Sequence, residues 1–122
     1  MKKSGWKSRI RKACQSAGTY REAFDHPIDT LADMLAKRDA AQAAFDADGG
    51  EILIPYENKG GGVNKVPHPA LKLVNELNRD ALAYWRDLGL TPAGLRKINE
   101  DALRPKRASP LSAALKDIGG KA

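Results

Sequence analysis

The stretch PALKLVNELNRDALAYWRDLG, residues 69–89, decides the fold of this chain. Its apolar residues recur at alternating spacings of four and three, which is the heptad pattern of an amphipathic helix. This seam consists of Ala70, Val74, Leu77, Ala81, Tyr84 and Leu88. Leu71, Leu82 and Trp85 widen the apolar face beyond one seam, so we expect the helix to contact two neighbours rather than one.

The rest of the chain offers little bulky apolar surface to cover this helix. The 122 residues suffice for one domain, and aromatic residues make up only 6% of them, so the core of a single subunit must be modest. We therefore predict that copies of the chain pack together through the long helix. The residues expected at this contact are Leu71, Val74, Leu77, Ala81, Leu82, Tyr84, Trp85 and Leu88.

The segment LGLTPAGLRKI, residues 88–98, follows directly. Gly89 is expected to end the long helix, and Thr91-Pro92 to begin a second one that reaches about residue 103. Helix, turn and helix also outline a DNA-reading helix-turn-helix, with Arg96 and Lys97 on its exposed side. Any helical hairpin with a glycine cap has the same outline, so we favour a packed corner and keep a helix-turn-helix regulator as an alternative.

Two further elements are predicted upstream. Apolar residues at helical spacing after Pro27 predict a helix that runs to residue 47, and EILIPYENKGGGVNKVP, residues 51–67, predicts a β-hairpin. A lone two-stranded hairpin is marginal in water, and Pro55 confines its strand to an edge or a bulge, so the hairpin must be supported by a helix or by another subunit. The residues expected to dock on a partner are Ile54, Tyr56, Lys59 and Val63.

The charges of the chain are segregated. Residues 1–21 contain seven Lys or Arg and no acid, residues 22–57 contain nine acids and two bases, and the overall net charge is +6. Basic ends of this kind suggest a polyanionic partner such as nucleic acid. The cations expected to contact DNA are Lys2, Lys3, Lys7, Arg9, Arg11, Lys12, Arg104, Lys106 and Arg107. We expect residues 1–18 to form a flexible arm, with a short helix there as an open alternative, and residues 104–122 to form a basic tail with a short helix after Pro110.

The sequence shows no catalytic apparatus. Asp25, Asp29 and Asp33 could line one helix face as in a metal-dependent nuclease, although early acids also complement the positive end of a helix dipole, which we favour. His26 and His68 lack further ligands at metal-binding spacing, and the glycines at residues 60–62 open a strand, whereas a phosphate-binding loop opens a helix. We therefore predict neither an enzyme nor a bound metal or cofactor.

No apolar run of membrane-spanning length occurs, and the basic N-terminus lacks the apolar segment of a secretory signal, so we predict a cytoplasmic protein. The single cysteine, Cys14, fits a reducing compartment and is expected to be a small, partly buried residue.

The region from Pro27 to Ile98 resembles the small terminase subunits of tailed bacteriophages, in the branch with a β-hairpin before a long central helix. The residues that carry the likeness are DTLADMLAKRD, GGEILIPYENKGGG and HPALKLVNELNRDALAYWRDLGLTPAGLRKI, with the basic tail that follows. The resemblance implies a mainly α subunit that forms a ring of eight or more copies, with residues 19–103 as its oligomerisation core.

The same resemblance implies a non-enzymatic function. Members of this family recognise viral DNA for packaging and present it to the large terminase subunit, which holds the ATPase and the nuclease. In this branch the GLTP turn is a structural corner, so DNA contact falls to the basic ends, which a ring repeats many times.

Overall fold

The computed structural model describes residues 1–103 of the chain and confirms a mainly α fold with one β-hairpin. Its elements are α1 (Lys3–Ala17), the 3-10 turn η1 (Glu22–Phe24), α2 (Asp25–Ala47), β1 (Leu53–Glu57), β2 (Val63–Pro67), α3 (Pro69–Asp87) and α4 (Pro92–Leu103). None of the described helices has the length and apolar character needed to cross a membrane.

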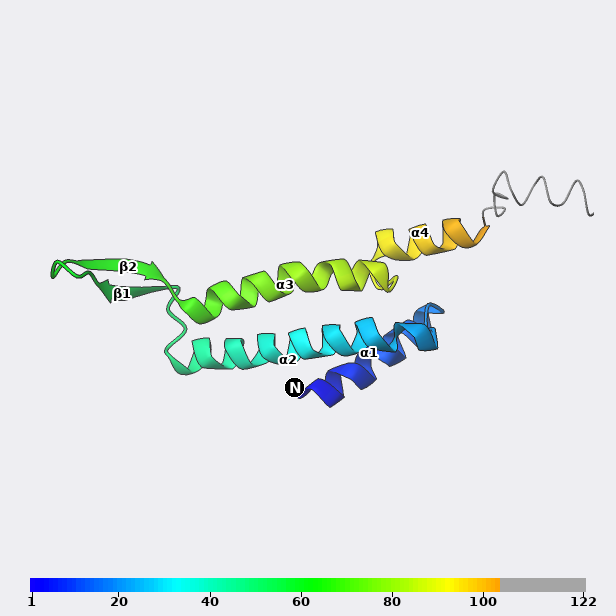
Figure 1. Cartoon of the computed structure of the whole chain (residues 1–122), viewed down its shortest axis with the longest axis horizontal. Coiled ribbons are helices and arrows are strands. Elements are labelled where there is room, and N and C mark those ends of the chain that lie inside the picture. Colours follow the sequence, from blue (N-terminus) through cyan, green and yellow to red (C-terminus); the bar gives the residue numbers. More distant parts are fainter. Residues whose placement is uncertain (104–122) are drawn as a thin grey trace, which may run out of the picture.

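The long helices α2 and α3 lie side by side and run in opposite directions (Figure 1). Both helices bury apolar residues at helical spacing in one core, which also receives residues from α1. The core residues are Ile10, Cys14, Ile28, Leu31, Ala32, Leu35, Ala81 and Leu88. At the hairpin end, the rings of Phe45 and the buried His68 lie nearly perpendicular to each other, with their centres 5.3 Å apart. The predicted long helix is confirmed.

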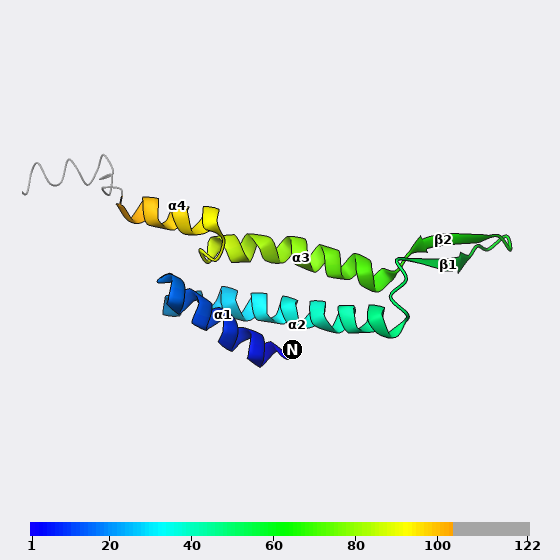
Figure 2. The same ribbon diagram turned by 180° about the vertical axis from the view of Figure 1, so that it is seen from behind.

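The prediction of a flexible arm over residues 1–18 is wrong. Residues 3–17 form the helix α1, which packs along α2 from Asp25 to Asp39 (Figure 2). Ile10 and Cys14 are fully buried. Ile10 and Cys14 are four residues apart, so they form a short apolar stripe that the surrounding Lys and Arg residues obscure in the sequence. Acidic side chains of α2 offset these cations, which allows the helix to dock.

The turn between α3 and α4 is a packed corner. Gly89 adopts the left-handed φ of 72°, and a Cβ there would come within 2.8 Å of Thr19. The Thr19 hydroxyl donates a hydrogen bond of 2.7 Å to the Leu88 carbonyl, which ties the loop after α1 to the end of α3. Thr91 caps α4, because its Oγ1 accepts a hydrogen bond of 3.0 Å from the Gly94 amide.

The β-hairpin and α4 project from opposite ends of the helical pair (Figures 1 and 2). In the hairpin, Ile54 pairs with Val66 and Tyr56 with Asn64. Only Ile54 and Val66 are half-buried, and the other strand residues are exposed. The exposed strand side chains are therefore available for contacts beyond the subunit. Such contacts would support the hairpin, since two strands alone have little stability.

Candidate nucleic-acid interface

The N-terminal cations divide into two groups according to their neighbours. Lys3, Lys7 and Arg11 face the acids of α2: Lys3 and Lys7 contact Asp29 at 2.9 and 3.3 Å, and Arg11 contacts Asp25 at 3.2 Å. Residues early in α1 contact Asp29, and the later Arg11 contacts the earlier Asp25, as expected for two antiparallel helices. Four-residue spacing of bases on one segment and of acids on the next is the sequence signal that could have predicted this pairing.

The contacts between Lys3, Lys7 and Asp29 shift the pKa values of Lys3 and Asp29. Hydrogen bonds from Lys3 and then Lys7 hold the pKa of Asp29 below its usual value of 3.8, and the hydrogen bond to Asp29 raises the pKa of Lys3. Both side chains are exposed to solvent, so the ion pairs orient α1 more than they stabilise it.

A second cluster fixes α1 at its N-terminal end, and nothing in the sequence pattern predicted it. The Trp6 Nε1 donates a hydrogen bond of 2.7 Å to Asp39, and the Arg38 guanidinium lies 5.4 Å from the centre of the Trp6 ring. Partial burial raises the pKa of Asp39, but hydrogen bonds from Trp6, the Met1 amine and Arg38 outweigh it and leave the pKa below the usual value. Trp6 therefore serves the packing of α1 and is not free to contact a ligand.

The second group of N-terminal cations is Lys2, Arg9 and Lys12. All three are exposed, and none has a carboxylate of residues 1–103 within ion-pair distance. The Arg9 guanidinium carbon lies 5.4 Å from the centre of the Trp6 ring. Trp6 is the side chain that anchors α1 to α2. Arg104, Lys106, Arg107 and the short helix expected after Pro110 lie outside the described residues.

The row of three aspartates has structural partners. Asp25 and Asp29 bind the cations of α1, and Asp33 pairs with Lys37 at 2.8 Å on its own helix. Within residues 1–103, no group of three His, Cys, Asp or Glu side chains is placed to hold a metal ion. The geometry therefore favours a structural interpretation of these acids over the nuclease hypothesis.

Cys14 is a core residue. It is fully buried, and its burial raises the pKa of the thiol, against a smaller opposing effect of its hydrogen bond with Thr19. A thiol held neutral in the core is a poor nucleophile, so Cys14 has no reactive role.

The predicted subunit contact on α3 needs correction. Val74, Ala81 and Leu88 are at most 5% exposed and are buried within the subunit, because this seam faces α2 and the central core. Tyr84 and Trp85 also pack against that core and are half-buried. Leu71 and Leu77 are half-buried, and Leu82, at 53% exposed, remains the most accessible of the predicted contact residues. The apolar face of α3 is therefore only partly covered in one chain.

The hairpin residues expected to dock on a partner are accessible. Tyr56 and Val63 are 57% and 68% exposed, Lys59 is exposed, and Ile54 is half-buried against Val66. No other part of the described chain covers Tyr56 or Val63, so the hairpin tip offers two apolar side chains and one cation to a partner.

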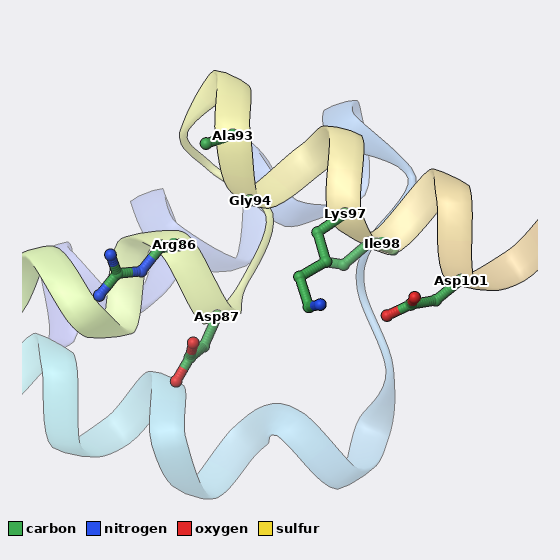
Figure 3. Close-up of a pocket in the computed structure, with 7 residues that line it drawn as sticks. All are labelled: Arg86, Asp87, Ala93, Gly94, Lys97, Ile98 and Asp101. Carbon is green, nitrogen blue, oxygen red and sulfur yellow. The ribbon is translucent and has the colours of Figure 1, made fainter.

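A hollow of about 510 Å³ lies where α4 crosses the end of α3 (Figure 3). Arg86 and Asp87 approach it from α3, and Lys97, Ile98 and Asp101 approach it from α4 (Figure 3). Cations and carboxylates alternate around it, which does not match the single-sign lining of a phosphate site. The hollow results from the corner, and its mixed charges do not favour a phosphate ligand.

These features define a class of protein. The chain is a thin helical subunit with two projecting elements and an incompletely covered central helix, and it exposes several cations. Such features are typical of one subunit in a larger assembly that binds a polyanion. The match to the family model for the phage terminase small subunit extends over residues 3–102, and the chain belongs to that family. The match includes α1, which the sequence resemblance had left out. Neither the comparison with curated proteins nor that with solved structures gave a match.

Proposed function

We propose that this subunit binds double-stranded viral DNA as a ring of eight or more copies and presents the DNA to the large terminase subunit. Membership of the small terminase family supports a role in phage DNA packaging and carries this proposal. We further propose that the subunit is not an enzyme, needs no cofactor and acts in the host cytoplasm. On this view ATP hydrolysis and DNA cleavage belong to the large subunit, and the small subunit supplies DNA recognition and regulation.

The DNA contacts are assigned to the exposed cations. Lys2, Arg9 and Lys12 are available on the surface of α1, whereas Lys3, Lys7 and Arg11 are engaged by Asp25 and Asp29 and contribute less. Arg104, Lys106 and Arg107 are expected to add to this surface. A few weak phosphate contacts in each subunit give strong binding when a ring repeats them around one duplex.

The experiment that tests this assignment is a salt titration of DNA binding. We expect the double variant Lys2→Gln/Lys12→Gln to lower the affinity for a short duplex and to reduce the slope of log affinity against log salt by about 1 for each phosphate that is no longer neutralised. We expect the same of a variant with Arg104, Lys106 and Arg107 changed to Gln. The matched control is Lys59→Gln/Lys65→Gln, which removes the same charge from the hairpin.

Unchanged affinity and slope in both test variants would contradict the assignment. Loss of sequence preference on Arg96→Ala or Lys97→Ala, with the protein a dimer, would instead support the helix-turn-helix regulator.

A further inference from the structure

The sides of α3 that do not face α2 differ in charge. With about 100° of rotation per residue, positions seven apart lie in nearly the same column of a helix. One column contains Lys72, Arg79 and Arg86, and another contains Leu73, Asp80 and Asp87. The half-buried Leu71 and the exposed Leu82 lie beside the basic column, on the side away from the acidic one.

The charged residues of both columns lack partners within the described chain. Arg79, Arg86, Asp80 and Asp87 are exposed, and no ion pair or side-chain hydrogen bond joins any of them to residues 1–103. Asp80 follows Arg79 and Asp87 follows Arg86, yet neighbouring positions on a helix point apart and do not pair. Each subunit thus carries unpaired cations on one side of α3 and unpaired carboxylates on another.

Each of the two sides also carries apolar groups. An open hollow of about 420 Å³ lies between the base of the hairpin and α3, on the side of the basic column. Ile52, Pro67 and Leu71 form its apolar part, and Lys72, Asn75, Glu76 and Arg79 form its rim. Leu73, which heads the acidic column, is 45% exposed and projects on the other side of the helix.

We propose that a second copy of this chain packs its acidic column against the basic column of the first, with the two α3 helices parallel. Leu73 of one copy enters the hollow of the next, Asp80 lies beside Arg79, and Asp87 lies beside Arg86. This inference rests on the proposed function, because it gives the ring its subunit contact.

The positions along the helix agree with a closed ring. Copies related by pure rotation about an axis parallel to α3 have equivalent residues at the same height, and a rise along that axis would give a filament instead. At about 1.5 Å per residue, Asp80 differs in height from Arg79 by about 1.5 Å and Leu73 from Leu71 by about 3 Å. An antiparallel two-fold contact through either column alone would place like charges together, which disfavours a symmetric dimer.

The test uses two charge-reversed proteins, Arg79→Asp/Arg86→Asp and Asp80→Arg/Asp87→Arg. In the first protein both columns are acidic, and in the second both are basic. We expect each alone to need at least about tenfold more protein than the unmodified chain to assemble, because every contact then joins like charges. An equimolar mixture should assemble again into species with alternating subunits, as an even-numbered ring or as an open chain, since every contact between the two kinds joins opposite charges.

Mass photometry or light scattering at several concentrations reads the result, and circular dichroism confirms that the exposed substitutions leave the helices folded. Arg21→Glu and Glu100→Lys are single-reversal controls away from both columns and should leave the mass unchanged. The proposal is contradicted if either reversed protein assembles like the unmodified chain, or if the mixture stays dissociated.

Two outcomes separate this inference from the function on which it rests. An unmodified chain that assembles while the reversals change nothing overturns the inference and leaves the ring standing, whereas an unmodified chain that stays monomeric overturns both. If Arg79→Asp/Arg86→Asp loses DNA affinity but keeps its mass, the basic column is a DNA surface and the subunit contact lies elsewhere.

Discussion

Gly94 shows how a single residue sets the position of a whole helix. A Cβ at this position would overlap the Arg86 carbonyl oxygen, so α4 approaches the end of α3 more closely than any other residue type allows. The sequence indicated a turn at Gly89 and Thr91 but offered no sign of this approach, because it joins residues of two different helices.

We expect Gly94→Ala to displace α4 and to lower the free energy of unfolding by about 1–3 kcal/mol, as overpacking of a close contact does. Gly60→Ala is the matched control, because a Cβ there meets no atom within 4 Å. Denaturant titration of both variants measures the difference. Equal stability of the two would show that α4 does not pack on α3 in this way.

The ion pairs of Asp29 and Asp39 predict how α1 responds to acid. Both carboxyls have pKa values below the usual 3.8, so their stabilising effect is complete above that pH and disappears as the pH falls through the lower folded-state values. As the pH falls below 3.8 we therefore expect the N-terminal part of α1 to be held less firmly against α2 and the environment of Trp6 to become more polar. Fluorescence of a Trp85→Phe variant, which reports Trp6 alone, follows this change.

The variant Asp29→Asn in the same Trp85→Phe background should loosen α1 even at neutral pH, because it removes the partner of both Lys3 and Lys7. Trp6 fluorescence that stays constant across the acid range in the parent protein would contradict this account of α1.

The elements differ in how far the sequence could predict them. The helix α3, its glycine end and the Thr-Pro start of α4 follow from local patterns, and so does the hairpin at residues 53–67, since each needs only its own residues. The helix α1 was harder to predict, because only two of its residues are fully buried in the core. Its cations are also neutralised by acids of another segment, which a local pattern does not show. The same limit applies to α3, where periodicity identified an apolar seam without showing that the seam faces α2.

The hairpin gives a prediction at the scale of an element. Because Tyr56 and Val63 are exposed, Tyr56→Ser/Val63→Ser should change the free energy of unfolding by no more than about 0.5 kcal/mol. If the hairpin docks on the large terminase subunit, the same variant should weaken binding to that purified protein. Calorimetric titration measures the affinity, with Asn64→Ser on the facing strand as a control.

A marked loss of stability in the isolated variant would mean that the hairpin packs on its own chain. Unchanged affinity for the large subunit would remove the hairpin from the docking surface.

At the scale of the whole molecule, the subunit is poorly suited to exist alone. Its core is built where three helices meet, while the hairpin and α4 extend away from it at opposite ends (Figure 1). The exposed Leu73 and Leu82 and the unpaired charges of α3 add to the surface that one chain leaves uncovered. Composition predicted this deficit, but only the fold shows which face of α3 the subunit keeps for itself and which it offers to others.

Native mass spectrometry of the unmodified chain at micromolar concentration tests the central claim most directly. The account predicts a closed ring as the one dominant species, because each subunit has two different complementary faces and only a closed ring satisfies all of them. The proposed function sets its size at eight or more subunits. A monomer or a dimer as the dominant species at that concentration would contradict it.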